Sequence, residues 1–180
     1  MVKEPRPGRV KTRLGADIGL TNAAWWFRHQ TRQLLCRLRD PRWQIILAVA
    51  PDHEGLQSRV WPPDLPRLPQ GPGNLGDRMA RLLRATQGPS LVIGADIPGI
   101  ERHHIAEAFS ALGQNASVLG PAPDGGYWLV GLAHPSRAPN ALFQNVRWST
   151  KDAMQDTERS LPAPVAHVSA LRDVDTAADL

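Results

Sequence analysis

The sequence predicts an α/β fold in the form of a three-layer α/β/α sandwich. Segments with helical periodicity alternate with short apolar segments bounded by Gly and Pro, as expected when helices cover both faces of a sheet. Two of these apolar segments are closely followed by an acid, Asp96 or Asp124, where a strand would end. Because 180 residues suit one domain with its own core, we expect residues 1–180 to form a single domain.

The charges are unevenly divided along the chain. Residues 1–42 contain ten Lys or Arg and three acids, whereas residues 43–180 contain eleven Lys or Arg and fourteen acids. A basic segment beside an acidic remainder suits an anion that is bridged by a metal. A nucleic-acid surface would need a basic face supported by a recognisable motif, so we expect no nucleic-acid partner.

The cysteine content and the apolar runs predict a cytoplasmic protein. A single cysteine, Cys36, excludes an internal disulfide and is typical of a reducing compartment. Because leucines surround Cys36 in the sequence, we expect a buried thiol and no nucleophile there. The longest apolar run, residues 45–50, is too short to insert into a bilayer, and the basic start lacks the apolar part of a signal peptide.

The chain starts with a basic segment, residues 3–14, which contains five Lys or Arg, two prolines and a glycine. Gly8 would allow the backbone to approach a ligand, and Arg9, Lys11 and Arg13 could reach phosphate oxygens. The spacing differs from that of a P-loop. Composition alone also fits a solvated basic tail.

Helical periodicity and capping residues define four main helices. Thr21 could cap the first helix, and Pro41 would end it. Asn74 could cap the second helix, with Leu75 facing inward, after a glycine-rich loop that is only a weak anion-site or sugar-site signal. Ser149 or Thr150 could cap the fourth. The expected helices are residues 21–39, 75–86, 101–112 and 149–159, with a terminal helix that starts at Thr176.

Five short apolar segments are expected as buried strands, since each is bounded by turn residues. They are residues 44–49, 91–94, 117–121, 127–132 and 164–169. Residues 52–69 are rich in proline and have no periodic pattern, so we expect a connecting segment there.

Four acids follow strands or lie in extended chain. Open α/β sheets bind ligands beyond the carboxyl ends of their strands, where Asp96 could hold a hard divalent metal or simply cap the next helix. Asp124 follows a neighbouring strand end and could face the same crevice, although Asp-Gly is also common in hairpin turns. Asp173 and Asp175 would share a face of an extended segment and could approach one metal, or could cap the terminal helix.

Six blocks of the sequence resemble, in order, one bacterial family of GT-A-fold transferases named after radical-SAM/selenodomain neighbours. That family is similar to 2-phospho-lactate guanylyltransferase and, more distantly, to the molybdenum-cofactor guanylyltransferase. The resemblance covers almost the whole chain. The blocks are Lys3-x-Pro-x-Pro-Gly-x-Val-Lys-Thr-Arg-Leu14, Gln70-Gly…Leu75-Gly-Asp-Arg-Met79, Gly94-Ala-Asp-Ile-Pro98, Gly120-Pro-Ala-Pro-Asp-Gly-Gly-Tyr127, Trp148-Ser-Thr150 and Asp173-Val-Asp-Thr176.

The resemblance implies a Rossmann-like, mostly parallel sheet with a nucleotide and Mg²⁺ or Mn²⁺ at its carboxyl edge. Lys11 and Asp96 would be catalytic. The implied donor-phosphate contacts are Gly8, Arg9, Lys11 and Arg13; the implied metal ligands are Asp96, Asp173 and Asp175; and the implied acceptor or sugar contacts are Asp124, Gly125 and Gly126.

These observations lead to a functional hypothesis with two alternatives. We expect a metal-dependent transferase that moves a nucleotidyl group from a nucleoside triphosphate to a small phosphorylated or hydroxylated acceptor. The first alternative is a glycosyltransferase that uses a nucleotide-sugar. The second is a non-catalytic nucleotide-binding domain, because only Met1 and Val2 stand where relatives have a complete first strand, which we expect to be shortened. The sequence leaves the oligomeric state open.

Overall fold

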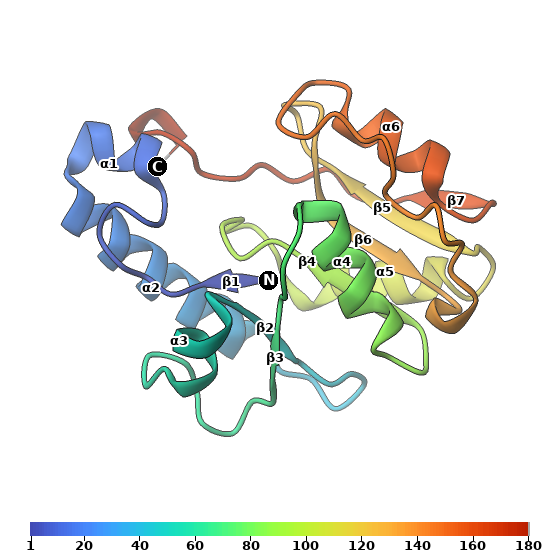
Figure 1. The fold of residues 1–180 in the computed structure, drawn as a ribbon, viewed down its shortest axis with the longest axis horizontal. Coiled ribbons are helices and arrows are strands. Elements are labelled where there is room, and N and C mark those ends of the chain that lie inside the picture. Colours follow the sequence, from blue (N-terminus) through green and yellow to red (C-terminus); the bar gives the residue numbers. More distant parts are fainter. Residues whose placement is uncertain (180) are drawn as a thin grey trace. The chain divides into compact units, whose positions relative to one another are not determined.

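The structure, a computed structural model that describes residues 1–179, divides into two compact units (Figure 1). Unit 1 contains Met1–Gln70, Gly94–Arg102 and the chain from Asp173 onward; unit 2 contains Gly71–Ile93 and His103–Arg172. Each unit is therefore assembled from stretches that are separated in the sequence. The expectation of a single domain stays a prediction.

Unit 1 is built on a parallel three-stranded sheet in the order β1-β2-β3. The strands are β1 (Val2–Lys3), β2 (Leu47–Ala50) and β3 (Arg67–Pro69). The buried Gln70 donates its side-chain amide to the carbonyls of Val2 and Ala48, at 3.0 and 2.9 Å, so it ties the two-residue β1 to β2. The first strand is short, as expected.

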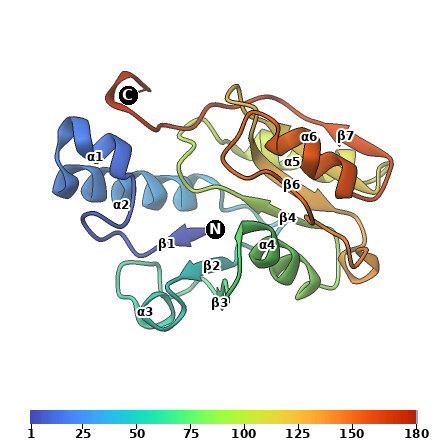
Figure 2. The same cartoon turned by 45° about the horizontal axis from the view of Figure 1, so that its top comes forward.

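Three helices accompany this sheet: α1 (Thr12–Ile18), α2 (Leu20–Arg37) and α3 (Asp52–Gln57). Figure 2 shows α2 and α3 on either side of the strands in that view. Apolar residues of α2, such as Phe27 and Leu35, share one buried cluster with Leu47 and Val49 of β2. α1 and α3 were not expected, because helices of seven and six residues are too short to display a helical period.

The longest helix of the described chain, α2, differs from expectation at its start and on its outer face. It begins at Leu20, directly after Gly19, and has no side-chain cap, so Thr21 is not the cap. Cys36 is exposed, because the neighbouring leucines occupy the inner face of the helix. Across residues 1–179, no helix combines the length and the apolar character needed to cross a membrane.

Unit 2 contains a four-stranded sheet in the order β4-β6-β5-β7. Its strands are β4 (Ser90–Ile93), β5 (Ser117–Pro121), β6 (Tyr127–Leu132) and β7 (Val165–His167). β6 is antiparallel to both β4 and β5, whereas β7 is parallel to β5. β4 lies at the edge of this sheet and is half-buried, so the prediction of a buried strand there is wrong.

Helices cover both faces of the unit 2 sheet. Successive residues of a strand point to opposite faces. On one face, the Tyr127 hydroxyl lies 3.9 Å from Met79 Sδ and accepts a hydrogen bond from Thr157 at 3.3 Å. On the other, the Trp128 ring meets His104 edge-on, with centroids 6.1 Å apart. α4 (Leu75–Arg84) and α6 (Ala153–Ser160) therefore lie opposite α5 (Arg102–Ala111), which makes three layers.

Of the predicted helix starts in unit 2, one is confirmed and one is wrong. Asn74 caps α4 as expected, in a reciprocal capping box with Asp77, although Leu75 is exposed and does not face inward. α6 begins at Ala153, later than predicted, so neither Ser149 nor Thr150 is its cap. Two short 3₁₀ turns, Pro135–Arg137 and Ala177–Asp179, complete the elements.

Candidate functional site

Three carboxylates from two distant segments converge within unit 1. Asp96 lies just after β4 in the sequence, and Asp173 and Asp175 lie in the terminal segment. One oxygen from each of the three side chains lies within 4.8 Å of the others. We refer to these residues as the acid cluster. The structure therefore brings together all three acids that were expected to bind a metal.

Val174 explains how this cluster forms. Its side chain is buried in a small apolar cluster with Leu14 and Ala23, and its backbone N–H donates to the carbonyl of Asp96 at 3.2 Å. Because side chains alternate along extended chain, burying Val174 directs the residues on either side of it away from that apolar cluster. The acidic side chains of the terminal segment thus reach the segment that carries Asp96.

The terminal turn fixes the segment further. One oxygen of Asp179, Oδ2, accepts hydrogen bonds from the backbone N–H groups of Asp175 and Thr176, at 3.1 and 2.9 Å, and from the Thr176 hydroxyl at 2.8 Å. Asp17 of α1 accepts a further bond from the N–H of Ala177 at 2.9 Å. Sequence reasoning missed both anchors; the contact with Asp17 could not be predicted locally, because only the fold brings α1 against the terminal turn.

Lys11 joins the acid cluster from the start of α1. Its backbone is left-handed, with φ 46°, and its side chain is only 8% exposed. The ammonium lies 2.6 Å from Asp96 Oδ2 and 2.9 Å from Asp175 Oδ1. Burial alone lowers the pKa of Lys11, but Asp96 and Asp175 raise that pKa above its ordinary value, so Lys11 is a cation at neutral pH.

Arg13 is the outermost member of this group. Its guanidinium lies 3.1 Å from Asp175 Oδ2, while the side chain is 75% exposed. Asp175 therefore contacts two cationic side chains, Lys11 and Arg13. Partly exposed carboxylates at this spacing can accept a further cation, and the exposed guanidinium can accept an anion beside them.

The carboxylates of the acid cluster are suitable ligands for the divalent metal that the fold family implies. Mg²⁺ and Mn²⁺ prefer oxygen ligands, and carboxylates are the usual protein source. The acid cluster supplies one carboxylate from each of three residues at ligand-to-ligand spacing. The close approach of Lys11 to Asp96 and Asp175 also demonstrates that these oxygens are directed toward a positive charge.

The other two residues expected to contact donor phosphates are placed differently. Gly8 has φ 75° and lies in the exposed loop before α1. Arg9 Nη1 lies 3.5 Å from Oε1 of Glu54 on α3, and Arg6 lies 3.1 Å from the other oxygen of Glu54. Sequence reasoning missed Glu54, because the proline-rich segment around it was interpreted as a connection.

The three residues expected to face the acceptor or sugar form the hairpin between β5 and β6 in unit 2. The N–H of Gly126 donates to Asp124 Oδ1 at 2.9 Å, and the N–H of Gly125 donates to the carbonyl of Ala122 at 3.2 Å. The Asp-Gly pair thus makes the hairpin turn that was one of its two interpretations. The sequence predicted that Asp96 and Asp124 follow neighbouring strands. This prediction is wrong, because β6 is inserted between β4 and β5.

Comparisons with known proteins agree with this architecture. Residues 34–150 match the family DUF2064, described as "Uncharacterized protein conserved in bacteria". A solved structure described as a "putative nucleotide-diphospho-sugar transferase", from Desulfovibrio desulfuricans G20, matches with 30% identity and a TM-score of 0.84. The match covers 97% of this chain and 80% of that one. No curated protein matches the chain.

These matches confirm the mixed α/β fold, with a parallel sheet and covering helices, that the sequence predicted. They also confirm the GT-A-like type of that fold. The closer likeness to the two guanylyltransferases and the association with radical-SAM proteins stay predictions.

Proposed function

The chain belongs to the DUF2064 family, and we propose that it is a metal-dependent transferase that uses a nucleotide-activated donor. The observation that carries the proposal is the convergence of Asp96, Asp173 and Asp175 with the buried cation of Lys11. The description of the structural neighbour as a nucleotide-diphospho-sugar transferase supports the class of donor.

In this proposal the acid cluster holds Mg²⁺ or Mn²⁺. When bound, the cation would neutralise charge on the phosphate oxygens of the donor. Lys11 would act as a fixed ammonium beside those oxygens, since the two carboxylates hold it in place. Arg13 would add a planar fork of donors at the exposed side of the cluster. Catalysis would then rest on positioning and on stabilisation of negative charge.

The remaining residues have proposed binding roles. Gly8 and Arg9 would contact the donor phosphates, with Arg9 exchanging Glu54 for a phosphate oxygen. Asp124, Gly125 and Gly126 would face the acceptor or the sugar. We propose a small-molecule acceptor, no nucleic-acid partner and a cytoplasmic location, in line with the composition and charge distribution.

Two transfer reactions remain in this class, each favoured by one observation. The Lys-Thr-Arg-Leu and Ala-Asp-Ile-Pro blocks resemble the guanylyltransferases and favour nucleotidyl transfer, which would release pyrophosphate. The description of the structural neighbour favours glycosyl transfer, which would release a nucleoside diphosphate. We place nucleotidyl transfer first because the sequence blocks belong to this chain itself.

Thermal unfolding with a panel of donors tests the proposal. Nucleoside triphosphates and nucleotide-sugars would each be added with and without Mg²⁺, because a ligand that binds only the folded state raises the unfolding temperature. A Mg²⁺-dependent rise with a triphosphate, followed by pyrophosphate release, supports nucleotidyl transfer. A rise only with a nucleotide-sugar supports glycosyl transfer. Binding without turnover supports the non-catalytic alternative, and no rise with any donor contradicts the proposal.

A further inference from the structure

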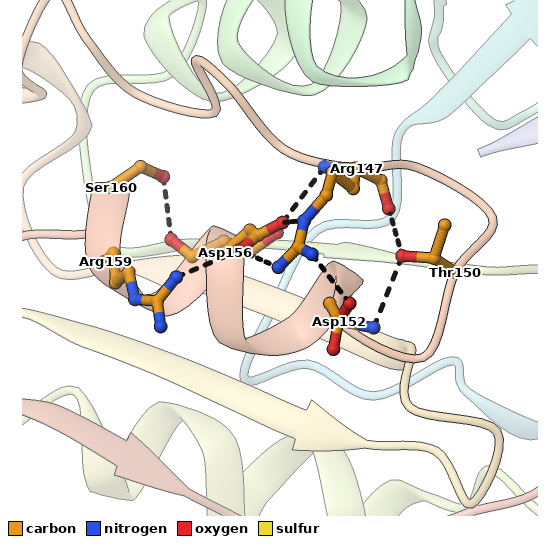
Figure 3. Close-up of polar contacts among 7 residues, drawn as sticks. Arg147, Thr150, Asp152, Asp156, Arg159 and Ser160 are labelled. Carbon is orange, nitrogen blue, oxygen red and sulfur yellow. Dashed lines mark hydrogen bonds and ion pairs between the residues drawn. The ribbon is translucent and has the colours of Figure 1, made fainter.

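The segment that precedes α6, residues 147–152, is held by a dense set of charged contacts (Figure 3). Arg147 makes a two-pronged ion pair with Asp156, with Nε 2.7 Å from Oδ2 and Nη2 3.0 Å from Oδ1. Its third nitrogen, Nη1, lies 2.8 Å from Asp152 Oδ2. One guanidinium therefore connects the start of the segment to two points around the first turn of α6.

Asp156 is the centre of this network. It is 8% exposed and also accepts hydrogen bonds from the backbone N–H of Arg147, at 3.2 Å, and from Arg159 at 3.1 Å. Hydrogen bonds from Arg147 are the main reason that the pKa of Asp156 falls to about 2. A buried carboxylate that receives this many donors is fully ionised near neutrality and geometrically fixed.

The backbone of the segment is also folded tightly. The Thr150 hydroxyl donates to the carbonyl of Arg147 at 2.7 Å and accepts from the N–H of Asp152 at 3.3 Å. Ser149 adopts a left-handed conformation, with φ 61°, which costs energy in a residue other than Gly. The ion pairs of Arg147 stabilise this conformation.

The same segment packs directly against the hairpin turn of residues 122–126. The N–H of Met154 donates to the carbonyl of Gly125 at 3.0 Å. Gly125 has φ 87°, and a Cβ atom at that position would collide with the backbone carbonyl of Lys151. Gly125 is thus required both by the turn and by the close approach of the two backbones.

We propose that Arg147 is a positioning residue that holds residues 147–154 against the hairpin and thereby sets the position of Asp124, Gly125 and Gly126. The inference rests on the proposed function, in which these three residues face the acceptor or the sugar. Arg147 does not act on the substrate itself. Its effect passes through Asp152 and Asp156 to the Met154–Gly125 contact.

The chain contains a matched control for this role. Arg147 and Arg159 both pair with Asp156, and their side chains are similarly exposed, 57% and 64%. Arg159 lies on α6 itself, three residues from Asp156, so its ion pair connects one helical turn to the next. Only Arg147 also binds Asp152 and precedes the segment that meets the hairpin. R147M and R159M therefore remove the same charge but different connections.

Amide hydrogen exchange of wild type, R147M and R159M tests the inference without any need for turnover. We expect R147M to raise exchange in residues 122–126 and at Met154 about tenfold, since the segment opens locally, and R159M to leave both within about twofold of wild type. Equal exchange in all three proteins, or an equal rise in both variants, would overturn the inference. If R147M does not fold, R147K takes its place, with a smaller rise expected because Lys cannot form the fork.

Steady-state kinetics of the same proteins test whether the position of the hairpin affects binding of the acceptor or the sugar. We expect R147M to raise the KM for that substrate about tenfold and R147K to recover part of the loss, whereas the KM for a nucleoside triphosphate donor should stay within about twofold of the wild-type value. A changed exchange pattern with unchanged kinetics would contradict the effect on the substrate. If the wild type shows no turnover with any donor, the proposed function fails, whereas the exchange experiment still decides whether Arg147 positions the hairpin.

Discussion

The acid cluster in unit 1 and the Arg147 network in unit 2 are built from the same chemical groups but differ in how deeply their carboxylates are buried. In the network, Asp156 is buried and receives donors from two arginines and a backbone N–H. In the acid cluster, Asp96 and Asp175 are each about one-third exposed, and Asp175 pairs with the exposed Arg13. A buried carboxylate that receives several donors stabilises structure, whereas partly exposed carboxylates at ligand spacing are able to bind a cation.

The two groups also differ in how they are assembled. All pairs of the network lie within nine residues in the sequence. Lys11 and Asp175 are separated by 164 residues. Holding three carboxylates together costs electrostatic repulsion, and closing the long loops between them costs chain entropy. This difference is why we assign binding to the acid cluster and positioning to the network.

Replacing Asp96 should have the largest effect on the acid cluster. We expect D96N to lower turnover with the preferred donor on the order of a thousandfold, because it removes both a metal ligand and the partner of Lys11. Product release is the measurement. D64N is the matched control, since Asp64 is an exposed acid of the same unit that pairs with Arg39. Near-normal turnover in D96N would contradict a functional acid cluster.

Shortening Val174 should disturb the assembly of the acid cluster without changing any of its carboxylates. We expect V174A to destabilise the protein by about 2 kcal/mol, from the lost burial, and also to weaken the Mn²⁺ affinity. V118A, which shortens a fully buried valine of β5, should lower stability to a similar extent and leave Mn²⁺ affinity unchanged. Denaturant unfolding and metal titration measure the two effects. Equal Mn²⁺ affinities in both variants would contradict the role of Val174.

Acid titration should distinguish the network from the acid cluster. The pKa of Asp156 in the folded protein, about 2, lies below that of an aspartate in the unfolded chain, about 4. The unfolded state therefore binds a proton first, so the stabilisation from Asp156 is fully present above about pH 4 and is lost as the pH falls toward 2. We expect R147M to reduce the dependence of the free energy of unfolding on pH in this range. Urea unfolding at a series of pH values between 2 and 6 measures this dependence. A slope as steep as that of wild type would count against Arg147 as the cause.

The smallest effect is expected at Arg13, at the exposed side of the acid cluster. We expect R13Q to raise the donor KM by about threefold to tenfold and to leave stability nearly unchanged, since an exposed ion pair contributes little to folding. R39Q, whose arginine pairs with Asp64 elsewhere in unit 1, is the control for lost surface charge. An identical donor KM in R13Q and wild type would remove Arg13 from the binding site.

Local chemistry explains the parts of this structure that sequence reasoning predicted well. The strands β5 and β6 occur at the predicted residues, because runs of apolar residues bounded by Pro and Gly define their ends. Asn74 caps α4, because its side chain and that of Asp77 satisfy each other's backbone N–H groups. The alternation of Asp173, Val174 and Asp175 likewise determines that both acids flank one buried residue.

Tertiary structure decided what the sequence left open. Lys11 could equally have been part of a solvated tail; its burial between Asp96 and Asp175 depends on contacts across most of the chain. The insertion of β6 between β4 and β5, the exposed position of Cys36 and the pairing of Arg9 with Glu54 also depend on which surfaces meet. Short-range periodicity and capping specify the elements one by one, whereas strand order and long-range charge pairing are specified only by the packing of the whole chain.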